Sequence, residues 1–146
     1  MDIIRKNTDY ALRLMVNLAE RYGKGAVSSR TLAEEEGVTY FLTCKLLQKL
    51  SNAGFVKSEM GPKGGFYLCI PPSKITLAMV IDTIQGPVSL NSCLLGINVC
   101  PNQPTCPISK KLSELQNYID DFLKNITLKD LLEAKGDRVE IDEKGN

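Results

Sequence analysis

Three of the five cysteines lie close together in the sequence and have the residue type and spacing of metal ligands. Between Asn91 and Ile108 the chain reads N-S-C-L-L-G-I-N-V-C-P-N-Q-P-T-C-P-I, which contains Cys93, Cys100 and Cys106. Three prolines exclude a continuous helix, and the proline after Cys100 and after Cys106 fixes the backbone direction at each thiol. Thiolates select zinc, copper(I) or iron–sulfur clusters, so this segment predicts a chelating loop with one coordination position open for another ligand.

The spacing alone leaves several alternatives for this loop. The pattern C-x6-C-x5-C lacks the closely spaced C-x2-C pairs of ordinary structural zinc sites, and the chain contains no histidine. An iron–sulfur cluster, a zinc site, a disulfide with one spare thiol, and unrelated thiols all stay open. A nucleophile–histidine arrangement cannot be built without histidine, and no dinucleotide fingerprint is present, so the chain is not expected to be an enzyme.

The composition is that of an ordinary globular protein. The 146 residues are 43% hydrophobic and 24% charged, and no apolar run approaches the roughly 20 residues that span a bilayer. The first residues lack the apolar core of a signal peptide, and five cysteines in a reducing compartment are more naturally ligands, reactive thiols or core residues than disulfides. We therefore expect a cytoplasmic protein that does not bind a membrane.

The charge is divided unevenly between the two halves of the chain. Residues 1–75 carry 11 Lys and Arg against 7 Asp and Glu, which gives +4, whereas residues 76–146 carry 7 against 10, which gives −3. Phosphate binding depends on local charge rather than on the net charge of +1 for the whole chain. The division is compatible with a DNA-binding first half and an acidic second half that mediates assembly.

Helix signals in the first half predict a helix-turn-helix. Thr8 is expected to cap a helix over Asp9–Tyr22, where apolar residues recur at helical spacing. Ser28 and Thr39 each precede a further helix, and Gly37 supplies the turn between these two. A stripe of leucines is expected to be buried in the third helix, which leaves its other faces free to enter a DNA groove. The candidate DNA contacts here are Ser28, Thr39, Tyr40, Phe41, Cys44, Lys45, Gln48 and Lys49.

Two short apolar runs after the third helix predict a β-hairpin. Phe55–Met60 and Phe66–Ile70 have the character of strands, and Gly61–Gly65 between them has the composition of a tight turn. This turn joins two strands and lacks the Gly-Lys-Ser/Thr ending of a nucleotide-binding loop, so a DNA-contacting wing is the better interpretation. A helix-turn-helix followed by such a hairpin is a winged helix. The candidate contacts in the wing are Gly61, Lys63 and Gly64.

The second half predicts a connecting helix and a helix that mediates dimerisation. Thr76 is expected to cap a helix over Leu77–Gln85, directly before the cysteine loop. Beyond that loop, apolar residues recur at steps of four and three over Ile108–Ile126, the pattern of a helix that packs lengthwise on a partner. Packing within one chain is the alternative, but no second long helix is available to cover this seam. We therefore expect a homodimer that packs through Leu112, Leu115, Ile119 and Phe122.

A last short helix is expected over Leu128–Ala134, where Thr127 and Asp130 resemble a capping pair. The charged residues after it predict a disordered tail. The domain organisation is thus a winged helix-turn-helix over residues 1–75, a connecting helix with the cysteine loop over 76–108, a dimerisation helix with a short C-terminal helix over 109–136, and a tail over 137–146.

Several of these segments follow one another as in a known family. They are T-D-Y-A-L-R at Thr8–Arg13, L-A-E-E-E-G-V at Leu32–Val38, L-L-Q-K-L-S-N-A-G-F-V at Leu46–Val56, G-P-K-G-G-F at Gly61–Phe66 and, after the three cysteines, I-T-L-K-D-L-L at Ile126–Leu132. Over nearly the whole chain the sequence resembles the Rrf2 family of bacterial winged-helix regulators. The resemblance implies a mainly α fold with a small β-hairpin wing and a long dimerisation helix, and a homodimer that binds palindromic operators in double-stranded DNA.

The resemblance also implies a transcriptional regulator, expected to be a repressor, whose Cys93, Cys100 and Cys106 hold a [4Fe–4S] or [2Fe–2S] cluster. Members of the IscR kind add a histidine ligand, which this chain lacks, whereas Asp9 stands where members of the NsrR kind carry an aspartate ligand. The cluster would sense nitric oxide, iron or redox state. A cluster-free regulator controlled by a protein partner or by thiol oxidation, as in cysteine metabolism, is the alternative within the family.

One departure concerns the wing. Met60 stands directly before the Gly-Pro of the wing, where many members of the family carry an arginine. Arginine is the side chain that inserts best into a narrow minor groove. Lys63 at the tip of the wing is the nearest substitute in this sequence.

Overall fold

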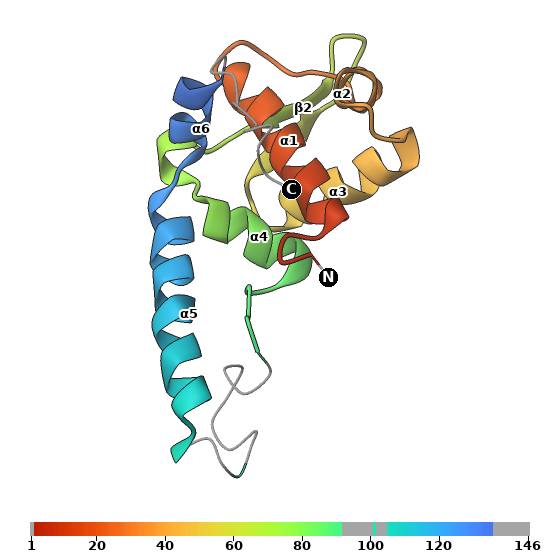
Figure 1. The fold of residues 1–146 in the computed structure, drawn as a ribbon. Coiled ribbons are helices and arrows are strands. Elements are labelled where there is room, and N and C mark those ends of the chain that lie inside the picture. The colour runs from red at the N-terminus through yellow and green to blue at the C-terminus, as the bar shows by residue number, and fades with distance from the viewer. Residues whose placement is uncertain (1, 92–100, 102–104, 136–146) are drawn as a thin grey trace, which may run out of the picture.

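The computed structural model describes residues 2–91, 101 and 105–135. The fold is mainly helical, with a small β-hairpin beside a cluster of helices and one long helix that extends away from it (Figure 1). The predicted fold class is therefore confirmed. None of the helices in the described ranges is long and apolar enough to cross a membrane. The elements are α1 (Lys6–Glu20), α2 (Ser29–Glu36), α3 (Tyr40–Asn52), β1 (Val56–Glu59), β2 (Gly65–Leu68), the 3-10 helix η1 (Pro72–Lys74), α4 (Leu77–Gln85), α5 (Pro107–Asn125) and α6 (Leu128–Ala134).

In the helix-turn-helix, α2 and α3 begin after the predicted caps, and α2 ends at the predicted Gly37. The Ser28 hydroxyl accepts from the backbone N–H of Thr31 at 3.1 Å, and the Thr39 hydroxyl accepts from that of Leu42 at 3.3 Å. Each bond satisfies one of the free N–H groups in a first helical turn. Gly37 ends α2 in the left-handed conformation, with φ of 65°, which lets the chain turn sharply into α3.

The first helix begins about one turn earlier than predicted. The N-cap position of α1 is Arg5, whose side chain makes no capping hydrogen bond. The prediction that Thr8 caps this helix was wrong, because Thr8 lies inside the first turn, fully buried, and its hydroxyl donates to Oε1 of Gln85 at 2.7 Å. Tyr22, expected in the same helix, lies beyond its end and is exposed.

The two strands pair antiparallel, with Val56 opposite Leu68 and Glu59 opposite Gly65. Both are shorter than the runs predicted from the sequence, and Gly65, expected in the turn, belongs to β2. A third segment accounts for the role of Gly65: Val27 pairs with Phe66 through backbone hydrogen bonds of 2.9 and 2.7 Å. A Cβ at Gly65 would collide with the Val27 backbone, so this close approach requires glycine.

One hydrophobic core joins the helices to the hairpin. α1 contributes Leu14 and Leu18, and α3 contributes the leucines at positions 46, 47 and 50, all of them buried. Val80 of α4 and Leu128 of α6 are fully buried in the same cluster. The core of the winged helix therefore includes side chains from beyond residue 75.

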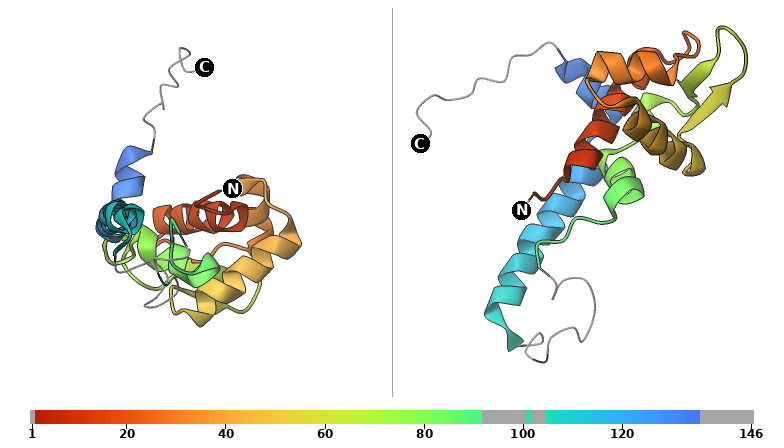
Figure 2. Two further views of the ribbon diagram at one scale, coloured as in Figure 1. Left: turned by 60° about the horizontal axis from the view of Figure 1, so that its bottom comes forward. Right: turned by 90° about the vertical axis from the view of Figure 1, so that its right-hand side faces the viewer.

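α5 extends away from this core, and only Ser109 is buried among its residues (Figures 1 and 2). Gln116 fixes the helix to the segment that follows α4, because its Nε2 donates to the carbonyl of Val88 at 2.7 Å and its Oε1 accepts from the N–H of Leu90 at 2.9 Å. On another side of α5, Leu115, Tyr118 and Phe122 are exposed within the described part of the chain.

The chain returns to the core directly after α5. The N–H of Leu77 donates to the carbonyl of Ile126, and the N–H of Leu128 donates to the carbonyl of Ile75, both at 2.9 Å. Thr127 and Asp130 then form the predicted capping box, and α6 packs on α1. This return ties the far end of α5 rigidly to the winged helix.

Candidate nucleic-acid interface

The exposed face of α3 presents an aromatic ring, cations and an amide at helical spacing. Phe41 is 79% exposed, and Lys45, Gln48 and Lys49 are exposed beside it, while Cys44 is half-buried. The opposite face is anchored in the core by Thr43 and three leucines, so the exposed face is held in a fixed orientation. Base edges in a major groove are read by amide and cationic side chains on such a helix.

The start of α3 is supported by a stacked cation that the sequence analysis missed. The guanidinium of Arg30, in α2, lies 4.8 Å from the centre of the Tyr40 ring. Tyr40 is 48% exposed, so its ring is accessible beside this cation. Ser28 and Thr39, both exposed, engage their hydroxyls in helix caps, as described above.

The wing ends in an exposed turn that carries one cation. Gly61, Pro62 and Lys63 are exposed, and Gly61 has φ of 105°, a conformation that favours glycine. Gly64 is partly buried, and a Cβ there would collide with the carbonyl of Glu59. The two glycines thus shape the turn, and Lys63 is the side chain at its tip that can reach a phosphate.

A polar network holds the helix-turn-helix on α1. Asn17 Nδ2 donates to carboxylate oxygens of Glu35 at 2.8 Å and of Glu36 at 3.0 Å. Arg21 forms an ion pair with Glu35, with a 2.7 Å contact from Nη2 to Oε1, and Arg13 bonds the backbone carbonyl of Glu36. The hydrogen bond from Asn17, and then that from Arg21, lowers the pKa of Glu35 below its usual value of 4.5.

The predicted metal ligands are only partly within the described residues. Cys93 and Cys100 lie outside them. Cys106 is a half-exposed free thiol at the N-cap of α5, and Asp9 is an exposed residue of α1. The start of α5 lies at the end of the molecule away from α1 (Figure 1). Within the described ranges, no three Cys, Asp or Glu side chains form a group able to hold a metal ion.

The predicted dimerisation residues divide into two sets. Leu115 and Phe122 are 48% and 53% exposed, whereas Leu112 and Ile119 are half-buried. Ile108 and Tyr118, at 65% and 69% exposed, lie on the same side of α5 as Leu115 and Phe122. Tyr118 was missed because it falls outside the single seam of four- and three-residue steps. The result is an apolar strip along α5 that residues 2–91, 101 and 105–135 leave uncovered.

Comparison with known proteins identifies one family over most of the chain. Residues 4–134 match the profile of the Rrf2 family, described as an iron-dependent transcriptional regulator. The chain is 30% identical to the HTH-type transcriptional regulator IscR of Aliivibrio salmonicida, over 84% of this chain and 73% of the relative.

Two solved structures have the same arrangement of helices and hairpin. CymR, the global cysteine regulator of Bacillus subtilis, gives a TM-score of 0.78 at 28% identity, over 92% of this chain and 99% of that chain. IscR of T. potens gives a TM-score of 0.71 at 26% identity, over 93% of each chain. The similar proteins thus include both IscR and CymR.

Proposed function

The chain belongs to the Rrf2 family of transcriptional regulators, and we propose that it is a dimeric DNA-binding repressor whose operator affinity is controlled by an iron–sulfur cluster. The observation that carries the DNA-binding part is the face of α3, where Phe41, Lys45, Gln48 and Lys49 are exposed on a helix that the core and a hydroxyl cap hold in place. Regulators of this kind are not enzymes, and no catalytic role is proposed for any side chain.

Each subunit would place α3 in the major groove and the wing against the phosphate backbone of the DNA. Lys45, Lys49 and Lys63 would contact phosphates, while Gln48, Tyr40 and Phe41 would contact bases or sugars. A symmetric dimer requires a palindromic operator, with half-sites about 34–36 Å apart or a multiple of that distance. The proposed DNA-binding unit comprises residues 1–75, with core side chains from α4 and α6.

The proposed cluster ligands are Cys93, Cys100, Cys106 and Asp9. Their chemistry fits the group, because thiolates bind iron–sulfur clusters and Cys106 is a partly exposed free thiol at the start of α5. The cluster would supply an iron that reacts with nitric oxide or responds to iron supply or redox state. Asp9 belongs to α1 and Cys106 precedes α5. Since the start of α5 lies at the end of the molecule away from α1 (Figure 1), we assign the fourth ligand to Asp9 of the partner subunit.

A cluster-free regulator is the second candidate, and the structural similarity to CymR supports it. That protein is described as a global cysteine regulator, and a related Staphylococcus aureus CymR has been solved in an oxidised form. In this chain Cys44 is a half-buried free thiol within α3, and Cys106 is a second free thiol. Oxidation of either thiol, or binding of a protein partner, would then control DNA affinity in place of a cluster.

The DNA-binding proposal is tested by selection from a random duplex library and by titrations at several salt concentrations. Lys49→Ala or Lys63→Ala should weaken binding to every sequence and reduce the salt slope by about one ion per phosphate contact removed. Gln48→Ala should change the selected sequence with less effect on bulk affinity. Lys129→Ala, which removes an exposed cation from α6, is the matched control. A parent protein that selects no sequence would contradict the proposal.

A further inference from the structure

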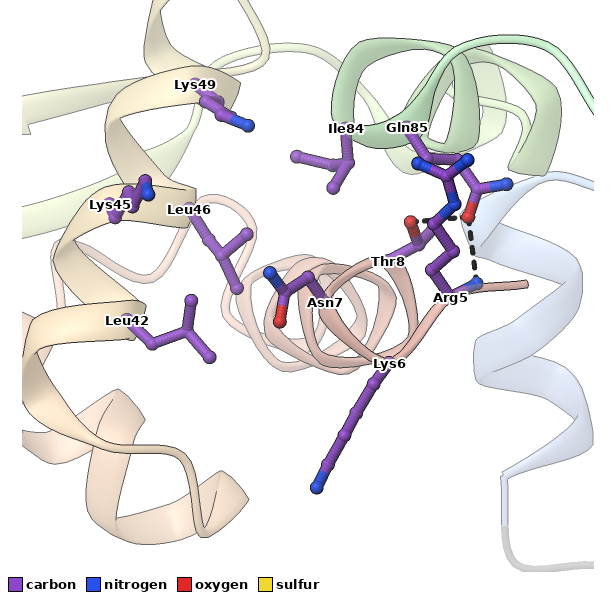
Figure 3. Close-up of a pocket in the computed structure, with 10 residues that line it drawn as sticks. All are labelled: Arg5, Lys6, Asn7, Thr8, Leu42, Lys45, Leu46, Lys49, Ile84 and Gln85. Atoms are coloured by element: carbon purple, nitrogen blue, oxygen red, sulfur yellow. Dashed lines mark hydrogen bonds between the residues drawn. The ribbon is translucent and has the colours of Figure 1, made fainter. Parts of the chain in front are cut away.

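Four cationic residues line a cleft that α3 shares with the start of α1. The cleft has a volume of about 450 Å³ and lies between α1, α3 and the end of α4 (Figure 3). Lys45 and Lys49 of α3 lie on one side, and Arg5 and Lys6 at the start of α1 lie on another. Lys45 and Lys49 were predicted from the sequence as DNA contacts, whereas Arg5 and Lys6 were not.

The charges in this cleft are not neutralised within the described part of the chain. None of the four cations forms an ion pair with a described carboxylate, and no acidic residue lines the cleft. Lys6 also lies over the Tyr10 ring, 5.7 Å from its centre. The positive charges of the lining side chains raise the local potential of the cleft, and this potential favours the binding of an anion.

The polar groups around the cations suit a phosphate. The N-terminal end of α1, with its partial positive charge, opens into the cleft, and the Arg5 side chain does not cap it. A volume of about 450 Å³ is within the roughly 300–1,000 Å³ range of small-ligand sites. It admits a phosphate group but not a DNA duplex, so a backbone would reach it from its edge.

We propose that this cleft binds a phosphate group through Arg5, Lys6, Lys45 and Lys49. The phosphate belongs either to the DNA backbone, in which case the cleft extends the interface beyond α3 and the wing, or to a phosphorylated small molecule that competes with DNA. This inference rests on the proposed DNA-binding function only for the first source. Arg5 is fixed in place because its backbone N–H donates to Oε1 of Gln85 at 2.9 Å, a bond that an Arg5 side-chain substitution leaves intact.

The test compares the Arg5→Gln/Lys6→Gln variant with the Lys74→Gln/Lys129→Gln variant. Both lose two cations from exposed positions, but Lys74 and Lys129 lie at η1 and α6, away from the cleft. Binding to a random-sequence duplex is measured by fluorescence anisotropy from low to high salt, and binding of pyrophosphate is measured by calorimetry. Circular dichroism checks that all proteins are folded.

A DNA phosphate in each cleft predicts that the salt slope of the dimer falls by about two units in the cleft variant, compared with the matched control. A phosphorylated small molecule predicts instead an unchanged slope, displacement of DNA by pyrophosphate in the parent, and at least tenfold weaker pyrophosphate binding in the cleft variant. Equal salt slopes and equal pyrophosphate binding in the two variants would overturn the inference. A parent protein that binds no duplex would contradict the proposed function. The pyrophosphate measurement alone would then decide whether the cleft binds phosphate.

Discussion

The buried hydroxyl of Thr8 donates a 2.7 Å hydrogen bond to Oε1 of Gln85, and this bond joins the start of α1 to the last residue of α4. The same oxygen accepts from the N–H of Arg5 at 2.9 Å, and Nε2 of Gln85 donates to the carbonyl of Ile3 at 2.9 Å. Gln85 is followed by Gly86 and the segment that leads to the cysteines. One side chain thus connects the end of α4 to Arg5 and to the helix that carries Lys6 and Asp9.

Replacing Gln85 by alanine should destabilise the protein, because the hydroxyl of Thr8 would be left buried without a partner. A buried polar group without its partner costs about 1–3 kcal/mol. Thr8→Val removes the hydroxyl but keeps the shape of the side chain. In the Gln85→Ala protein, this second substitution should therefore lower the free energy of unfolding by less than it does in the parent. Urea unfolding of the four proteins in this cycle measures the coupling.

Thr83→Val provides the control for this cycle. The Thr83 hydroxyl donates only to the carbonyl of Met79 in its own helix, so its loss should change stability by less than about 0.5 kcal/mol. Additive effects of Gln85→Ala and Thr8→Val would show that the bond between them does not hold α1 on α4.

Acid should loosen the contact between α1 and α2 through Glu35. Its pKa is lowered by hydrogen bonds from Asn17 and Arg21, so the stabilisation is complete above the unfolded pKa of about 4.5 and is lost as the pH falls through the lower folded pKa. Glu35→Gln should therefore reduce stability at pH 7 and lose less stability than the parent between pH 5 and pH 3. Urea unfolding at several pH values measures this difference.

Glu34→Gln is the matched control, because Glu34 is an exposed neighbour in α2. Its pH profile should follow that of the parent. Parallel profiles for the parent and Glu35→Gln below pH 5 would mean that the network around Glu35 does not contribute to acid stability.

The apolar strip of Ile108, Leu115, Tyr118 and Phe122 should form the dimer contact. Leu115→Glu would place an unpaired charge between two helices, which costs several kcal/mol, so the dimer should dissociate at micromolar concentration. Asn117→Glu introduces the same charge at an exposed position of α5 away from the strip and should leave the dimer intact. Light scattering coupled to size-exclusion chromatography measures the mass. A Leu115→Glu dimer of unchanged mass would place the interface elsewhere.

Local signals made the helix boundaries predictable. Ser28, Thr39, Thr76 and Thr127 each cap the helix that the sequence assigned to them, because a cap bonds to a backbone N–H only two or three residues away. Thr8 has the same residue type but bonds to a side chain 77 residues further along the chain. Its role follows from tertiary packing that sequence spacing does not contain.

In the candidate site, too, residues that come together only through tertiary packing could not be predicted from the sequence. The exposed cations of α3 could be predicted, because the buried leucines on the opposite face determine which side chains point outward. Arg5 and Lys6 could not, since they join the cleft only when α1 and α4 pack beside α3. The pairing of Val27 with Phe66 was missed for the same reason, because an isolated bridge has no periodic pattern.

The cysteine substitutions separate the cluster-containing protein from the cluster-free alternative. Cys106→Ser is well suited to this purpose, because serine is favoured at an N-cap and α5 should be kept. It should abolish the broad visible absorption and the bound iron and sulfide of anaerobically purified protein. Cys69→Ser is the control, since the Cys69 thiol bonds the carbonyls of Gly54 and Phe55 at the base of the hairpin. A colourless parent without iron would favour the cluster-free regulator.

Mixed dimers then test whether Asp9 acts across the subunit interface. Asp9→Ala alone should keep a cluster with an altered spectrum or faster loss, because the three thiolates remain and a carboxylate is a harder, more weakly held ligand. In a dimer of one Asp9→Ala chain and one Cys106→Ser chain, ligation across the interface leaves one complete set of four ligands, whereas ligation within each chain leaves none. Co-expression with two affinity tags isolates the mixed dimer, and its spectrum and rate of cluster loss decide between the two. A mixed dimer without the parent spectrum, or Asp9→Ala identical to the parent in spectrum and nitric-oxide reactivity, would rule out Asp9 of the partner subunit as the fourth ligand.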